Sequence, residues 1–189
     1  MITLVWDHVE HAFTGELEQH GAAYVDADWV RGAGNAGVPA LASSEEDATR
    51  ALVAVAESAA SAAVSARRPA VAGHGFVARR VRELLGIDAE SPPPNPDLIV
   101  ETRWDPASLL ESTTRVADLG TVVLAGPPAG SFRFDLYADL HVRGVRLVSA
   151  PSRSALHTTG HVPTLERPAT VRLGEKLPEG AAWYRVVSS

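Results

Sequence analysis

The feature that most constrains the fold is a glycine turn between a short apolar run and a helical run. Residues 69–72 (Pro-Ala-Val-Ala) predict a buried strand, and residues 73–78 (Gly-His-Gly-Phe-Val-Ala) form a GxGxxA turn that leads into the helix Val77–Leu85. This order is typical of a dinucleotide-binding unit, in which Gly73 and Gly75 would let the backbone approach a pyrophosphate. If a nucleotide binds, we expect it at these two glycines.

The second half of such a unit is missing from the sequence. An acidic residue that binds the ribose is expected about 20 residues after the turn, but residues 92–96 read Pro-Pro-Pro-Asn-Pro, which cannot form a central strand. Too few residues remain between Gly86 and Asp97 for a βαβ crossover. We therefore expect a half-deleted cofactor site and no nicotinamide cofactor.

The chain divides into three parts. Residues 1–42 are β-rich, residues 43–150 alternate helices and strands, and residues 151–189 hold a loop and two alternating apolar runs. The middle part predicts an α/β fold with a parallel sheet and right-handed crossovers, and the last two runs predict a hairpin with a long turn. The predicted strands are Ile2–Trp6, Ala22–Val30, 69–72, Leu98–Thr102, Thr121–Ala125, Val145–Ser149, Ala169–Leu173 and Ala182–Val187. The first predicted helix begins at the Ser44 cap and ends at Arg67 and Arg68. The other predicted helices are Val77–Leu85, Pro106–Ala117 and Phe134–Val142.

Composition limits the class of protein. The 189 residues are 46% hydrophobic and 21% charged, which suits one compact globular unit. A net charge of -6 argues against a nucleic-acid or anionic-membrane surface. The absence of cysteine excludes a disulfide, a thiolate nucleophile and a cysteine-bound zinc. The N-terminus has no basic flank and no long apolar run, so we expect a cytoplasmic protein.

A longer stretch carries a family resemblance. Residues 97–152 read DLIVETRWDPASLLESTTRVADLGTVVLAGPPAGSFRFDLYADLHVRGVRLVSAPS. Together with the glycine turn, they make residues 50–152 similar to the nucleotide-binding domain of medium-chain, zinc-type alcohol and polyol dehydrogenases. The resemblance implies a shortened Rossmann-like sheet with strand order 1-4-5-6. It also implies that residues 1–42 are a remnant of the catalytic domain, to which residues 151–189 return.

Two departures from that family concern chemistry. Its catalytic zinc ligands, which are a Cys, a Gly-His-Glu segment and a further Cys or acid, have no matching motif here, and its four-Cys zinc lobe is absent. Where the family continues with small residues along the cofactor, this chain has Arg103 and Trp104. The resemblance therefore points to a shortened, degenerate member without zinc or nicotinamide sites.

The carboxyl ends of the first two predicted parallel strands form the candidate site, because open α/β sheets bind ligands there. His74 at a helix N-terminus is the candidate base, since the helix dipole favours a neutral imidazole, and Glu101 is its candidate acid/base partner. Arg103 would bind a carboxylate or phosphate. The substrate-binding candidates are Phe76, Thr102, Arg103, Trp104, Gly126 and Pro127.

Each of these assignments has an alternative. The alternative for His74 is that it only fills a position that varies in the resembling family, for Glu101 that it serves only structural hydrogen bonding, and for Arg103 that it is solvated or paired with Asp105. Metal-ligand types also occur near both ends, in the segment 7–11 (Asp-His-Val-Glu-His) and at His157 and His161, but their spacing is weak and we predict no metal.

Three functions remain open. The favoured one is cofactor-independent acid/base catalysis, such as isomerisation, dehydration or cyclisation, on a small anionic metabolite of a specialised biosynthetic pathway. The alternatives are a residual NAD(P)-dependent oxidoreductase and a non-catalytic binding or scaffold protein. The apolar edge Val145–Ser149 predicts a homodimer, unless Ala169–Leu173 covers that edge within one chain.

Overall fold

The structure is a computed structural model that describes residues 2–7, 9–17, 22–32, 44–88, 92–103, 105–126, 135–150 and 166–188. Its elements are β1 (Ile2–Asp7), β2 (Ala12–Leu17), β3 (Ala22–Asp26), α1 (Ala27–Gly32), α2 (Glu45–Ala63), β4 (Pro69–Ala72), α3 (Phe76–Leu85), β5 (Leu98–Glu101), α4 (Pro106–Arg115), β6 (Thr121–Leu124), the π-helix η1 (Leu136–His141), β7 (Arg146–Ser149), β8 (Ala169–Arg172) and β9 (Trp183–Val187). None of the described helices is long and apolar enough to span a membrane.

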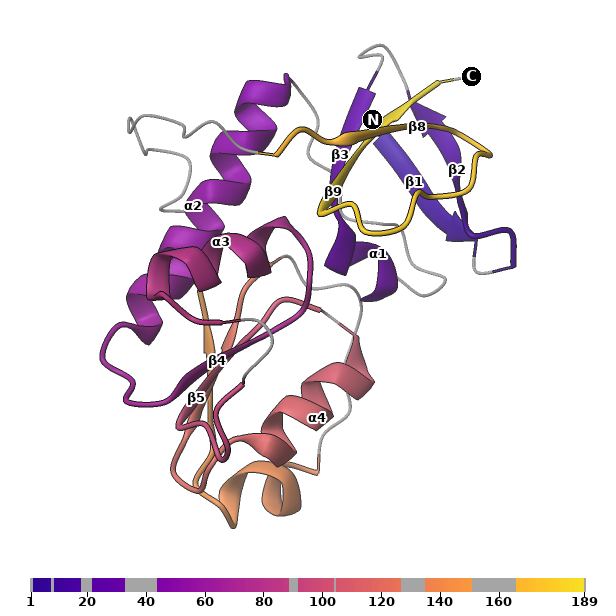
Figure 1. Cartoon of the computed structure of the whole chain (residues 1–189). Coiled ribbons are helices and arrows are strands. Elements are labelled where there is room, and N and C mark those ends of the chain that lie inside the picture. Colours follow the sequence, from indigo (N-terminus) through magenta and orange to yellow (C-terminus); the bar gives the residue numbers. More distant parts are fainter. Residues whose placement is uncertain are drawn as a thin grey trace.

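A four-stranded parallel sheet forms the centre of the α/β part, in the order β4-β5-β6-β7. Helices α2 and α3 pack on one face, where Val100 and Val123 point, and α4 packs on the other face, against Ile99 and Val122. Figure 1 shows α4 on the opposite side of the sheet from α2 and α3. The predicted α/β class and the shortened parallel sheet are confirmed.

Strand β4 lies at one edge of the sheet, and a single side chain binds the carbonyl oxygens on its outer side. Arg82 of α3 donates from Nη2 to the carbonyl oxygens of Val71, at 3.0 Å, and Gly73, at 2.5 Å. The neighbouring carbonyl of Ala72 faces the other way and accepts from the Thr102 amide of the adjoining chain segment. A guanidinium therefore pairs with the edge that a second strand would occupy in a longer sheet.

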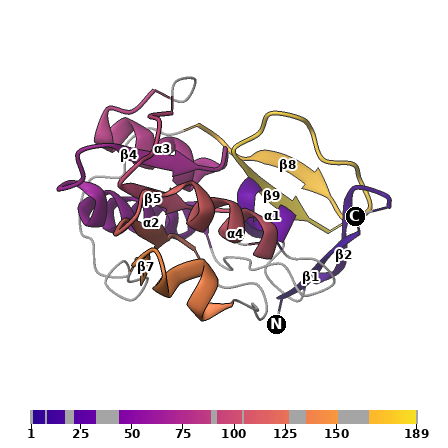
Figure 2. The same cartoon turned by 90° about the horizontal axis from the view of Figure 1, so that it is seen from below.

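The chain termini form two small sheets beside the α/β part, as Figure 2 shows. Strands β1 and β2 make an antiparallel hairpin, while β9 lies between β3, which is antiparallel to it, and β8, which is parallel to it. The predicted hairpin of Ala169–Leu173 with Ala182–Val187 is therefore wrong. The segment between them runs back along the first hairpin instead, where Gly174 N donates to Phe13 O at 2.9 Å and Leu177 N donates to His11 O at 3.2 Å.

Two predicted boundaries also need correction. The strand predicted over Ala22–Val30 ends at Asp26, where α1 begins. Helix α2 has the predicted Ser44 cap, whose Oγ accepts from the Asp47 amide, but it ends at Ala63 rather than at the two arginines. The amides of those arginines, residues 67 and 68, donate to the Asp97 carboxylate, so that segment turns into β4.

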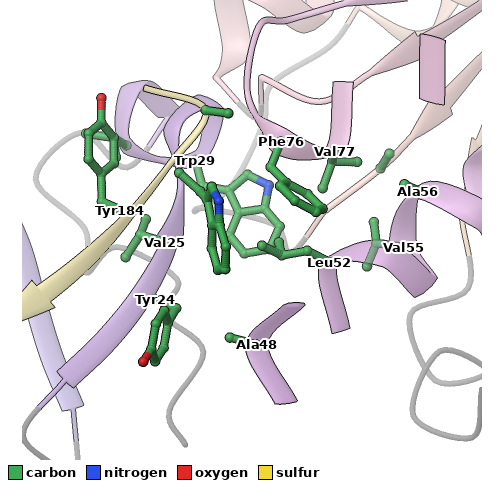
Figure 3. Close-up of a cluster of buried hydrophobic side chains, with 14 of the residues drawn as sticks. Tyr24, Val25, Trp29, Ala48, Leu52, Val55, Ala56, Phe76, Val77 and Tyr184 are labelled. Carbon is green, nitrogen blue, oxygen red and sulfur yellow. The ribbon is translucent and has the colours of Figure 1, made fainter. Parts of the chain in front are cut away.

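One hydrophobic core joins the α/β part to the terminal sheets (Figure 3). Leu52 of α2, Phe76 of α3 and Trp29 of α1 all point into it. Phe76 also packs on Trp183 of β9, with ring centroids 5.3 Å apart. Because residues from both parts fill this core, the two parts depend on each other for burial of their apolar surface.

We predict that Leu52→Ala lowers the free energy of unfolding by about 2–5 kcal/mol, because it leaves a cavity in this shared core. Leu84→Ala is the matched control, since Leu84 is 41% exposed and should change stability by about 0.5 kcal/mol. Urea unfolding measures both. Equal losses in the two variants would contradict the central place of Leu52.

Candidate functional site

The glycine turn between β4 and α3 is built around carboxylates from the N-terminal part of the chain. A Cβ atom added to Gly73, which has φ +119°, would lie 2.1 Å from Thr102 Oγ1 and 2.3 Å from Asp28 Oδ2. One added to Gly75 would lie 1.9 Å from Asp26 Oδ1. The two glycines are thus required by the close approach of this chain's own side chains.

Asp28 of α1 binds the turn directly. Its carboxylate accepts from the amide of His74, at 3.0 Å to each oxygen, and from the amide of Gly75 at 2.9 Å. The hydroxyl of Thr102, which follows β5, donates to Asp28 Oδ2 at 2.6 Å. The Asp28 side chain is buried, so these donors replace its hydration.

The amides of the next two residues, Phe76 and Val77, also donate hydrogen bonds. Val77 N donates to Asp26 Oδ2 at 2.9 Å, and Phe76 N donates to the carbonyl oxygen of Ala182 at 2.9 Å. Asp26 Oδ1 accepts from the Asp28 amide at 2.8 Å, which holds the two acids together. Four successive amides, of residues 74–77, are therefore satisfied by residues from the ends of the chain.

This arrangement does not fit the pyrophosphate of a dinucleotide. A phosphate at a glycine turn needs the free amides of the helix N-terminus, and here those of His74, Gly75 and Val77 donate to carboxylates. A phosphate would also have to lie beside Asp28, whose negative charge would repel it. The glycines Gly73 and Gly75, predicted as the place for a nucleotide if one binds, are closely approached by Asp26, Asp28 and Thr102.

Asp26, one of the two buried acids, has an unusual proton affinity. Burial, and then the neighbouring Asp28 carboxylate, raise the pKa of Asp26 to about 8, although the amides of Val77 and Asp28 oppose the rise. Asp26 therefore binds a proton at neutral pH. This proton reduces the repulsion between two acids that lie at one helix N-terminus.

A cavity of about 680 Å³ opens beside the turn, between α3 and the terminal sheets. Its volume is that of a small-molecule site. The imidazole of His74 is exposed at its wall. The remaining lining residues are Trp6, His11, Ala27, Asp28, Val30, Arg79, Lys176, Leu177, Pro178, Glu179, Gly180, Ala181 and Tyr184.

The cationic side chains of this cavity differ in their partners. Arg79 is held by its own bonds, since Nε donates to His74 O at 3.1 Å, Nη2 donates to Gly180 O at 2.7 Å, and Nη1 pairs with Glu166 at 2.7 Å. Lys176 forms no ion pair with any residue that the structure describes. It is exposed and is the cation of the cavity best placed to bind a ligand anion.

Glu101, predicted as the acid/base partner of His74, and Arg103, predicted to bind an anion, bind each other. The guanidinium donates from Nε to Oε1 at 3.1 Å and from Nη2 to Oε2 at 3.0 Å, and Ser112 Oγ donates to Oε2 at 2.5 Å. Burial raises the pKa of Glu101, and the bonds from Arg103 and Ser112 oppose that rise. Glu101 is only 2% exposed, so its carboxylate lies inside the protein and not in the large cavity.

Arg103 lines a smaller groove at the free edge of β4. The groove has a volume of about 150 Å³, and Arg82, Arg115 and His74 also line it. The alternative pairing of Arg103 with Asp105 is wrong. Arg103 pairs with Glu111 at 3.2 Å as well as with Glu101, and Asp105 caps α4 by accepting from the Ser108 amide.

The remaining predicted site residues lie in several different places. Phe76 and Thr102 are buried beneath the turn, where they contact Trp183 and Asp28. Gly126 lies just after β6 with φ 143°. Trp104 and Pro127 lie outside the described residues, as do His8, His157 and His161.

The metal-ligand types of the N-terminal segment meet no further ligands in the part of the chain that the structure describes. Within those residues, no three His, Asp or Glu side chains gather as a possible metal site. His11 instead lies on the wall of the large cavity, beside the ring of Trp6.

Sequence reasoning missed Asp26, Asp28 and Lys176. The two acids are separated from the turn by more than 45 residues of sequence, and no local pattern links them to it. The only available signal was the pair of acids at the end of an apolar run, which is unusual for a buried segment. Lys176 comes to the cavity only because its segment runs back along β2.

Comparison with known proteins adds little to this geometry. No protein-family model and no curated protein matches the chain. Among solved structures, it is similar to a Sinorhizobium meliloti protein assigned to the zinc-binding dehydrogenases and bound to NADP, with 12% identity, a TM-score of 0.49 and coverage of 74% of this chain and 58% of the other.

Two more solved structures show the same kind of similarity. The 2R,3R-butanediol dehydrogenase of Bacillus subtilis has 13% identity, a TM-score of 0.47 and coverage of 72% of this chain and 56% of its own. The L-idonate 5-dehydrogenase of Escherichia coli has 15% identity, a TM-score of 0.45 and coverage of 80% and 60%. The chain thus spans less than two thirds of these dehydrogenases, and at such identities the likeness says nothing about activity.

We predict that stability falls as the pH rises from about 4 to about 8. The pKa of Asp26 is higher in the folded protein than in the unfolded chain, so the folded state keeps a proton that the unfolded chain releases in this range. The slope from this group should reach about 1.4 kcal/mol per pH unit.

Asp26→Asn should flatten that slope, because the amide does not titrate, whereas the exposed Glu179→Gln should leave it unchanged. Urea unfolding between pH 5 and pH 8 measures all three proteins. An unchanged slope in Asp26→Asn would show that Asp26 does not bind the proton.

Proposed function

We propose that the protein performs cofactor-independent acid/base chemistry, such as isomerisation, dehydration or cyclisation, on a small anionic metabolite. The observation that carries this proposal is the exposed imidazole of His74 on the wall of a cavity of about 680 Å³. The His74 backbone is fixed by Asp28, and its carbonyl oxygen accepts from Arg79. An imidazole whose backbone is held beside a ligand-sized cavity can move a proton at a defined place.

The chemistry follows from the properties of the ring. A neutral imidazole accepts a proton at one nitrogen and carries one at the other, so His74 could remove a proton from one carbon or hydroxyl of the ligand and return it to a neighbouring atom. Both steps are needed in an isomerisation. In a dehydration, the returned proton would go to the leaving hydroxyl group, which departs as water.

Binding of an anion is supported by other residues that line the cavity. Lys176, His11, Trp6 and Tyr184 are among them, and His11 lies beside the Trp6 ring. An ammonium group attracts a carboxylate, and the two rings provide an apolar surface for the carbon skeleton of the ligand. A ligand held in this way would present its reactive atoms to His74.

In this proposal Glu101 does not act as the acid/base partner of His74 that the sequence predicted. Its carboxylate is committed to Arg103 and Ser112, so it acts as a positioning residue. Arg103, held by Glu101, is directed toward the small groove that His74 also lines. Arg103→Ala would leave Glu101 buried without its counter-charge, and it is therefore a poor test of ligand binding.

We also propose that the protein forms a homodimer through β7. This strand is at the end of the parallel sheet, and β8, the alternative cover for its edge, pairs with β9 in another sheet. Val148 on β7 is 42% exposed, and exposed apolar side chains of Leu119 and Val142 lie in neighbouring segments of this end of the fold. An edge strand that no described strand pairs with favours pairing with a second copy.

We predict that Lys176→Ala abolishes binding of the anionic ligand, whereas His74→Ala keeps binding and reduces turnover by about 100-fold or more. Thermal-shift screening with small carboxylates and phosphate monoesters identifies the ligand class, and product analysis by NMR then measures turnover of the compounds that bind. His141→Ala is the control, since His141 is exposed on η1 and lines neither cavity. Full activity in His74→Ala, or no compound that binds, would contradict the proposed catalysis.

We predict that Val148→Lys converts the dimer into a monomer, because it places a charge on the β7 edge. Val64→Lys is the matched control, since Val64 is 75% exposed at the end of α2, away from this edge. Light scattering at micromolar concentration measures the mass. A wild-type monomer, or a Val148→Lys dimer, would contradict pairing through β7.

A further inference from the structure

We propose that Asp28 is a built-in anion, which takes the position of a bound phosphate at the glycine turn and thereby excludes nucleotide phosphates from α3. This inference concerns specificity and does not depend on the proposed reaction. It would hold equally for an enzyme and for a binding protein. Residues 73–78 have the sequence of a phosphate-binding turn. In the structure, the anion at this turn is the side chain of Asp28 from the same chain.

The donor geometry around Asp28 is that of an anion site. The amides of His74 and Gly75 and the hydroxyl of Thr102 all donate to its two oxygens, at 2.6 to 3.0 Å. Amides at a helix N-terminus together with a hydroxyl are the groups that bind phosphate oxygens in glycine-turn sites. Here the same kind of donor set surrounds a carboxylate that is 1% exposed.

The glycines give a second, independent observation. A methyl group at Gly73 would overlap both Thr102 and Asp28, and one at Gly75 would overlap Asp26. Because neither residue 73 nor residue 75 has a side chain, an anion can approach the backbone of the turn. The space so created is filled by carboxylates of the β3–α1 segment.

The charge of Asp28 decides what else can bind. A phosphate brought to the turn would face this carboxylate at close range, and it would find the amides already engaged. A ligand of the large cavity must then place its anionic group away from the turn, and Lys176 is a cation of the cavity wall that forms no ion pair with a described residue. The expected ligand class is a small carboxylate or monophosphate held by Lys176, and dinucleotides are excluded.

The test removes the built-in anion and supplies a free one. Asp28→Ala leaves the donors of His74, Gly75 and Thr102 directed at an empty space of carboxylate size. We expect its melting temperature to fall by about 5 °C or more. Sodium formate or inorganic phosphate should then restore at least about half of that loss with saturation, because an anion that binds only the folded state stabilises it.

Matched controls separate this result from general salt effects. Sodium chloride at the same ionic strength should not restore the melting temperature, and formate should not raise that of the wild type. Asp28→Asn keeps the size of the side chain, so it should be destabilised without being rescued. An absence of saturable rescue in Asp28→Ala, or equal rescue in Asp28→Asn, would overturn the proposal.

A measurement on the wild-type protein covers the case in which Asp28→Ala does not fold. Calorimetric titration with NADH and NADPH should show no saturable binding at concentrations below roughly 1 mM. Micromolar binding of either compound would overturn the proposal even if acid/base catalysis were established, because the nucleotide phosphates would then have access to the turn. The reverse outcome, no nucleotide binding and no catalysis, would leave Asp28 as the internal anion and contradict only the proposed function.

Discussion

The contact of two buried acids with the start of α3 is the interaction on which the rest of the structure depends. Asp26 and Asp28 come from the β3–α1 junction, and they accept from amides of the glycine turn. The carbonyl of Ala182 accepts from a fourth amide, Phe76 N, and also accepts from Ala27 N, so β9 is fixed at the same point. Early, middle and late segments of the chain thus meet at one helix end, and the large cavity lies beside that junction.

The free edge of the four-stranded parallel sheet and the apolar surface of its helices are both covered by other parts of the chain. Arg82 satisfies the carbonyls at the free edge of β4, and the terminal sheets cover the apolar side of α2 and α3 through the shared core. Two hollows of different size lie beside these contacts. The groove left at the β4 edge is small and lined by arginines, whereas the cavity between α3 and the terminal sheets is large enough for a metabolite.

Local patterns predicted the α/β part well, since its signals lie within a few residues of each other. The Ser44 cap, the glycine turn, Pro106 at the start of α4 and the alternation of strands and helices predicted the elements and a parallel sheet, whereas the strand order came from the family resemblance. Long-range contacts were not predictable in this way. The parallel pairing of β8 with β9 depends on the first hairpin, and the partners of Glu101 and of the turn amides depend on how distant segments meet.

The most direct test of the central contact is hydrogen exchange of the turn amides in the wild-type protein, followed by NMR without any ligand. If the Asp28 and Asp26 carboxylates hold the start of α3, the amides of His74, Gly75 and Val77 should exchange as slowly as those of the core strand β5, because all of them open only with unfolding. Exchange of the His74 and Gly75 amides at the rate of exposed loop residues, while β5 stays protected, would show that the turn is open and would contradict the account.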